Sequence, residues 1–187
     1  MEKTDVKIHI IKEYSSTPVD PSEFDDVICS ETGTELHVAS QIEISGKYNK
    51  TYCVLTGFVR LNDNTVLVDG DRLFICLYKE IVVVDLATDK VVKIIDFDGY
   101  QLFGIYKFKS GYFVHGEITN MFLNADTACV WEYGCIDIFV NPRVENDLEI
   151  SDDYIAVYDW MGDRHYYNES GEFKTEYHPE LDMSKSK

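Results

Sequence analysis

The chain has 187 residues, of which 34 are Asp or Glu and 17 are Lys or Arg, so its formal net charge is −17 with histidine neutral. A surface this acidic repels phosphate groups and anionic lipids, which excludes nucleic acid and a membrane as partners. The length corresponds to one domain, so we expect a single β domain over residues 1–187 whose field attracts a basic protein partner.

The composition predicts a cytoplasmic protein rich in strands. Tyrosine and phenylalanine contribute 13 and 10 residues, and both residue types favour strands. The N-terminal residues lack the apolar core of a secretory signal, and no apolar run approaches the roughly 20 residues that span a bilayer. The five cysteines are odd in number and form no C-x-x-C pair. We therefore expect reduced, mostly buried thiols.

The N-terminal part, residues 1–60, is predicted to contain strands without a repeat. Alternating apolar and polar side chains predict strands at 5–13 and 35–44. The prolines between them predict a loop, with a short turn of helix after Pro21. Residues 51–61 are expected to form two strands or one long bent strand.

From Asp71 onward the chain is repetitive. The first unit contains predicted strands at 73–78, 81–84 and 91–95, and similar units begin at Ser110 and Ser151, about 40 residues apart. The polar turn residues Asp85, Asn124 and Asn168 recur at similar places in their units.

The stretch IVVVDLATDKVVKI resembles the inner hairpin of a β-propeller blade, in which a strand ends in Asp or Asn and a Thr-containing turn leads to a strand that opens with Lys. FLNADTACVWEY and YYNESGEFKTEY are similar to it more loosely. The resemblance covers about residues 71–177. Because a closed ring takes four or more blades, we predict an all-β antiparallel meander of about three blade-like units, a partial or open propeller. Residues 178–187 are predicted to be a frayed tail.

The sequence contains no motif for catalysis, cofactor binding or metal binding. A G-x-S-x-G nucleophile motif and a G-x-G phosphate loop are both absent, and the five histidines have no partner at metal-ligand spacing. Cys135 is the most turn-like cysteine, and a buried strand position is favoured for it over a nucleophile. We therefore expect no enzymatic activity, no cofactor and no bound metal.

Residues 144–187 concentrate acidic charge beside aromatic rings, with 12 Asp or Glu against 4 Lys or Arg. Carboxylates steer a cationic protein toward such a surface, and exposed rings anchor the contact or stack on arginine. Trp160 falls at a turn and is expected to be an exposed ring, whereas Tyr154 and Tyr158 share a strand face that could belong to the core. The predicted partner-binding residues are Asp152, Asp153, Asp159, Trp160, Asp163 and Tyr166.

In size, charge and lack of catalytic motifs, the chain resembles the acidic immunity proteins of bacterial contact-dependent and polymorphic toxin systems. The resemblance implies a toxin–antitoxin pair in which carboxylates occupy the place of substrate phosphates in the basic active site of a cognate nuclease toxin. Two alternatives stay open. One is a non-catalytic β-repeat interaction scaffold, and the other is a hydrolase or lyase that uses a carboxylate pair such as Asp159 and Asp163.

Overall fold

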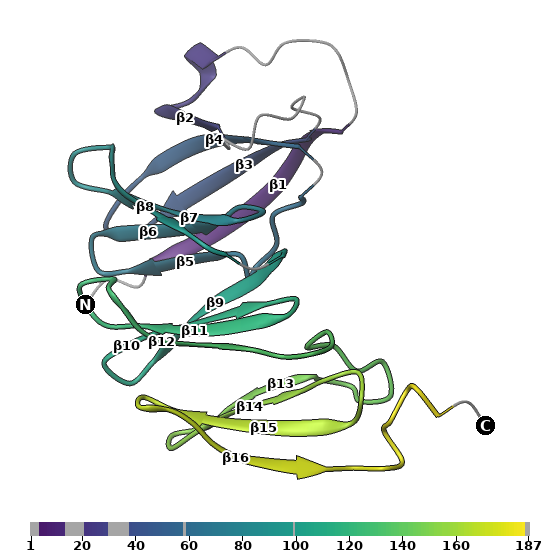
Figure 1. Cartoon of the computed structure of the whole chain (residues 1–187). Coiled ribbons are helices and arrows are strands. Elements are labelled where there is room, and N and C mark those ends of the chain that lie inside the picture. Colours follow the sequence, from purple (N-terminus) through teal and green to yellow (C-terminus); the bar gives the residue numbers. More distant parts are fainter. Residues whose placement is uncertain (1–3, 14–20, 30–37, 58, 99, 186–187) are drawn as a thin grey trace. The chain divides into compact units, whose positions relative to one another are not determined.

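The computed structural model describes residues 4–13, 21–29, 38–57, 59–98 and 100–185. Over these residues the chain forms strands β1 to β16, arranged as four sheets of four strands (Figure 1), and one 3-10 turn, η1, at Pro21–Glu23. The predicted all-β class is therefore confirmed. No helix among the described residues has the length and apolar character that a membrane crossing requires.

The chain divides into two compact units, Met1–Asp98 and Gly99–Lys187, and each is described by itself. The sequence-based expectation of one domain stays a prediction.

The first unit contains two sheets around one core. The N-terminal sheet has the order β1-β3-β4-β2, with β2 parallel to β4 and the other pairs antiparallel. Its strands are Asp5–Glu13 (β1), Asp26–Cys29 (β2), Val38–Ser45 (β3) and Lys50–Thr56 (β4). The second sheet is an antiparallel meander of Val66–Asp69 (β5), Arg72–Cys76 (β6), Glu80–Asp85 (β7) and Lys90–Asp96 (β8). Ile42, Tyr52, Leu73 and Val84 are among the buried side chains that join both sheets in one apolar cluster.

The N-terminal strands depart from the prediction in two ways. They form a fourth sheet in addition to the three predicted blade-like sheets. The strand order of this fourth sheet, β1-β3-β4-β2, is not the sequential order of a meander. The strand predicted at 51–61 ends at Thr56, where the Thr56 hydroxyl donates to the carbonyl oxygen of Val59 at 2.6 Å.

The second unit contains two antiparallel meanders. The strands of the first are Leu102–Phe108 (β9), Gly111–Gly116 (β10), Thr119–Leu123 (β11) and Cys129–Gly134 (β12). Those of the second are Leu148–Ile150 (β13), Ile155–Tyr158 (β14), Asp163–Asn168 (β15) and Gly171–Tyr177 (β16). Their shared core is largely aromatic and includes Phe113, Phe122, Phe139 and Tyr167. The three predicted blade-like units correspond to β5–β8, β9–β12 and β13–β16.

The recurring polar turns have one physical cause. Asp85, Asn124 and Asn168 each stand at or just after the end of the third strand of a meander. Their side-chain oxygens accept the amide two residues later, from Ala87, Asp126 and Ser170, at 2.8–2.9 Å. Asp and Asn are the residues that make this turn, which is why they recur.

Replacing Asn124 by alanine removes two hydrogen bonds, because its side-chain oxygen also accepts the Ala128 amide at 2.9 Å. We expect a loss of about 1–2 kcal/mol in the free energy of unfolding, measured by urea denaturation. Asn146→Ala, at an exposed loop position, serves as the control. Equal losses in the two variants would contradict the structural role of the Asn124 turn.

The end of the chain is held more firmly than predicted. The Arg143 guanidinium donates to the carbonyl oxygens of Glu180 and Asp182, both at 2.9 Å, and the Met183 amide donates to the Trp160 carbonyl at 3.0 Å. The described part of the tail, through Lys185, is therefore docked and not frayed. These contacts span 23–39 residues in sequence, so the polar composition of the tail could not predict them.

Strand β8 is an edge strand with an exposed apolar surface. Val91, Val92 and Ile94 are 44%, 56% and 42% exposed, and the strand lies at the end of its sheet. Lys90 and Lys93 interrupt this apolar row.

Candidate functional site

The six predicted partner-binding residues lie at three separate places on the sheet formed by β13 to β16. Asp152 and Asp153 are exposed in the β13–β14 turn, where Asp153 lies 3.9 Å from the Lys109 ammonium group. Asp159, Trp160 and Asp163 lie in or beside the β14–β15 loop, at the opposite end of β14. Tyr166 lies within β15. The six residues therefore do not form one patch.

Tyr166 belongs to a sheet face where aromatic rings surround an arginine. The Arg164 guanidinium lies 5.1 Å from the ring centre of Tyr158 and 4.9 Å from that of Tyr166, and it pairs with Glu149. The Tyr166 hydroxyl donates to Glu176 at 2.8 Å. These rings already stack on the chain's own cation. Since neighbouring strand residues face opposite sides, this surface is distinct from the one that carries His165.

Trp160 is only partly exposed, which corrects the expectation of an exposed ring. Its amide donates to the Ile138 carbonyl at 2.9 Å, and its carbonyl accepts the Met183 amide. These two backbone hydrogen bonds hold the β14–β15 loop to the segment after β12 and to the tail. The neighbouring side chain, Met161, is the exposed one, at 39%.

A segment that follows β12 crosses from one sheet of the second unit to the other. The Cys135 amide donates to the Ile118 carbonyl at 2.8 Å, and the Phe139 amide donates to the Glu117 carbonyl at 2.6 Å. At its far end, Ile138 accepts the Trp160 amide. This segment carries the Cys135 side chain to the β14–β15 loop.

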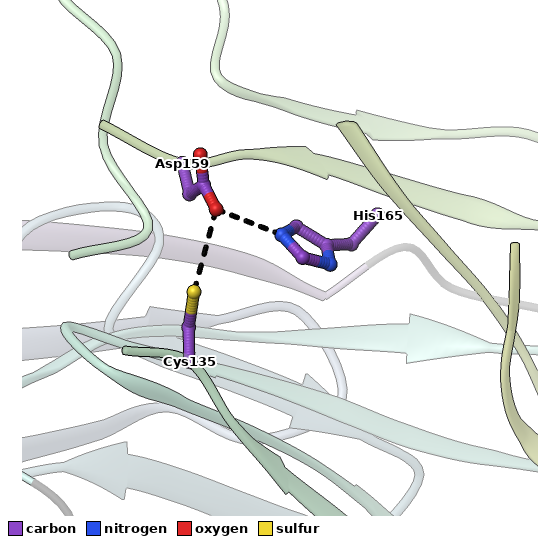
Figure 2. Close-up of side chains that lie close together, drawn as sticks. All are labelled: Cys135, Asp159 and His165. Carbon is purple, nitrogen blue, oxygen red and sulfur yellow. Dashed lines mark hydrogen bonds and ion pairs between the residues drawn. The ribbon is translucent and has the colours of Figure 1, made fainter. Parts of the chain in front are cut away.

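Cys135, Asp159 and His165 meet in one cluster (Figure 2). The Cys135 Sγ lies 3.3 Å from Oδ2 of Asp159, and Nε2 of His165 lies 2.9 Å from the same oxygen. The three ligand-type atoms all lie within 4.8 Å of one another. Asp159 is buried, at 2% exposed, while Cys135 and His165 are partly buried.

Further contacts fix the orientation of these side chains. Oδ1 of Asp159 accepts the Asp163 amide at 2.9 Å, which turns Oδ2 toward the cluster. Nδ1 of His165 lies 3.4 Å from the Thr175 hydroxyl and 3.9 Å from a Glu172 carboxylate oxygen. The imidazole packs edge-on against Phe139, with ring centres 5.4 Å apart.

The cluster contains an ion pair at neutral pH. Burial on its own lowers the pKa of His165, but its hydrogen bonds to Asp159 and Cys135, together with the charges of those two groups, outweigh this and raise the pKa to about 10. Burial on its own raises the pKa of Asp159, yet hydrogen bonds from His165, the Asp163 amide and Cys135 hold it below its ordinary value. Burial and the nearby Asp159 charge raise the pKa of Asp163. The imidazolium and the Asp159 carboxylate are therefore both charged at pH 7.

A cavity of about 390 Å³ opens beside the cluster. Its lining includes four carboxylates, those of Asp137, Asp159, Asp163 and Glu172. Two apolar side chains in the lining are well exposed, Ile136 fully and Met161 at 39%. The cavity thus combines excess negative charge with apolar groups that are accessible to a partner.

Cys135 and His165 both contact the same oxygen of Asp159, at 3.3 Å and 2.9 Å. A carboxylate with a lowered pKa is a weak base. What the three side chains do offer is sulfur, oxygen and nitrogen donors directed at one point.

Sequence reasoning placed Asp159 and Asp163 in the site but missed Cys135 and His165. Cys135 and Asp159 are 24 residues apart, and they come together only through the crossing segment after β12. The expectation of mostly buried cysteines holds for Cys53 and Cys76, while Cys29 and Cys129 are exposed. All five cysteines are free thiols.

No family model matches this chain, and no curated protein is similar to it. Among solved structures, the computationally designed Ika8 protein has a TM-score of 0.53 at 10% identity, over 76% of this chain and 46% of that one. BamB from Moraxella catarrhalis has a TM-score of 0.50 at 13% identity, over 88% of this chain and 54% of that one. The chain spans about half the length of each. BamB is a propeller-like β-repeat protein, so the likeness supports the fold alone, a propeller-like set of four-stranded sheets.

Proposed function

We propose that the protein is an acidic binding module that captures and neutralises a basic protein, and that the partner class is a cognate bacterial nuclease toxin in the cytoplasm. The observation that carries the proposal is the acidic cavity of the second unit within a chain of net charge −17. A nuclease active site is basic because it binds phosphate, so an acidic surface of complementary shape can occlude it.

The docking point is the mouth of this cavity. A lysine or arginine side chain that enters would meet Asp137 and Asp163, while its methylene groups and neighbours pack on Ile136 and Met161. The pKa of Asp163 is raised by burial and by the charge of Asp159, so an arriving cation stabilises this carboxylate. Desolvated contacts of this kind govern the dissociation rate, whereas the overall charge governs association.

Two double variants of equal charge change test the location. Asp137→Asn with Asp163→Asn removes two charges at the cavity, and Asp152→Asn with Asp153→Asn removes two at the far end of β14. We expect both to slow association by a similar small factor. Only the cavity pair is expected to raise the dissociation rate, by about 10-fold or more, because a buried charge pair is worth about 2 kcal/mol or more.

The experiment begins with co-purification from the organism that encodes the chain and identification of the bound protein. The association and dissociation rates of that pair are then measured at low and at physiological salt. The proposal requires a basic partner whose nuclease activity falls in proportion to the amount of this protein added. An acidic or neutral partner, unchanged nuclease activity, or association that ignores salt would each overturn it.

The alternative of a β-repeat scaffold is favoured by the propeller-like fold, which BamB shares. A scaffold needs no acidic cavity, so it predicts partner binding that is equally insensitive to both double variants.

A further inference from the structure

We propose that Cys135, Asp159 and His165 form a binding site for one divalent transition metal of the zinc class, with the adjoining cavity at the open coordination position. The sequence predicted no metal because no ligands are closely spaced along the chain. The fold brings donors that are distant in sequence together, from the segment after β12, the residue that follows β14, and strand β15.

The donor set selects the metal. Thiolate sulfur, imidazole nitrogen and carboxylate oxygen together are ligands of zinc and neighbouring transition metals, whereas calcium and magnesium require oxygen ligands alone. When the ion binds, it replaces the thiol and imidazolium protons, which pass to solvent.

The spacing suits a small tetrahedral ion. Metal–ligand bonds of about 2.0–2.3 Å place tetrahedral ligand atoms about 3.3–3.7 Å apart. The separation between Cys135 Sγ and Asp159 Oδ2 is 3.3 Å, and that between His165 Nε2 and Asp159 Oδ2 is 2.9 Å. Asp159 and His165 must move slightly apart to admit the ion, and the three ligand atoms all lie within 4.8 Å of one another.

The supporting contacts already orient each ligand. Asp159 presents Oδ2 because Oδ1 is held by the Asp163 amide. His165 presents Nε2 while Nδ1 faces Thr175 and Glu172, the kind of outer contact that fixes a metal-binding imidazole. The three protein ligands leave a fourth position, and the cavity of about 390 Å³ gives a water molecule or a ligand access to it.

The test uses the full chain, stripped with a chelator and then titrated with ZnCl₂ or CoCl₂. We expect one zinc per chain by elemental analysis, and cobalt absorption bands of a thiolate-bound tetrahedral ion. Cys135→Ser should weaken binding by more than about 100-fold, since loss of an outer contact alone costs 10–100-fold. Cys129→Ser, at an exposed thiol in the same unit, is the matched control and should bind as the parent protein does.

Thr175→Val is a second variant that keeps all three ligands and removes one outer contact. We expect it to fold normally by circular dichroism and to bind zinc about 10-fold more weakly. The proposal is overturned if the parent chain binds no stoichiometric zinc, or if Cys135→Ser binds zinc and cobalt as tightly as Cys129→Ser does.

Discussion

Gly162→Ala is expected to destabilise the second unit by about 2–4 kcal/mol and to displace the loop that carries Asp159. Gly162 has a φ of +83°, which L side chains rarely adopt. An added Cβ would lie 2.6 Å from the His178 carbonyl oxygen and 2.8 Å from the Asp182 amide nitrogen. Both neighbours are backbone atoms of the docked tail, so neither can move without breaking other contacts.

The measurement for Gly162→Ala is urea unfolding followed by tryptophan fluorescence. Trp131 and Trp160, the two tryptophans of the chain, both lie in the second unit, so the signal reports on it directly. Gly134→Ala is the control in the same unit, because its Cβ would meet atoms at ordinary distances of 3.7 Å and 3.9 Å. If both variants lost the same stability, the close approach of the tail at Gly162 would not be the cause.

In the metal-free protein, Asp159→Asn is expected to lose about 3 kcal/mol of stability at pH 6, because it leaves the His165 imidazolium without its buried partner. The variant keeps the shape of the side chain and an acceptor for the Asp163 amide. The oxygen that faces His165 is replaced by an amide nitrogen, so the loss reports on the charge and the hydrogen bond of the ion pair together. Asp153→Asn, at an exposed carboxylate, should change stability by less than about 0.5 kcal/mol.

The same variant should change the pH dependence of stability. The folded-state pKa of His165 is raised from 6.5 to about 10, so its contribution is fully present below pH 6.5 and is lost as the pH rises toward 10. The parent protein should therefore lose more stability than Asp159→Asn between pH 6 and pH 10, in unfolding experiments at both values. Parallel pH profiles for the two proteins would show that His165 is not held in its protonated form by Asp159.

Sequence reasoning succeeded where the signal is local. The turns at Asp85, Asn124 and Asn168 are made by a side chain and an amide two residues away, so residue type alone predicts them. The recurrence of these turns then located the three meanders. Strand alternation predicted β1 at its observed bounds for the same reason.

Sequence reasoning failed where the contact is distant along the chain. The sequence around Cys135 does not indicate that its amide will donate to Ile118 and that the Phe139 amide will donate to Glu117. These two hydrogen bonds place the Cys135 side chain next to Asp159. Trp160 was expected to be exposed because turns usually lie at the surface. That assumption does not hold for this turn, because the docked tail lies against it and the Met183 amide donates to the Trp160 carbonyl.

The acidity of this chain bears on the behaviour of strand β8. In the described part of the chain β8 is the last strand of its sheet, and with the exposed apolar side chains of Val91, Val92 and Ile94 it is a template to which another copy can add a strand. At low ionic strength, mutual repulsion between copies of charge −17 opposes such stacking. At about 1 M salt the screening length falls to about 3 Å and this protection is lost. Concentrated salt should therefore promote edge-to-edge assembly through β8. Variants that neutralise carboxylates should assemble in this way at a lower salt concentration.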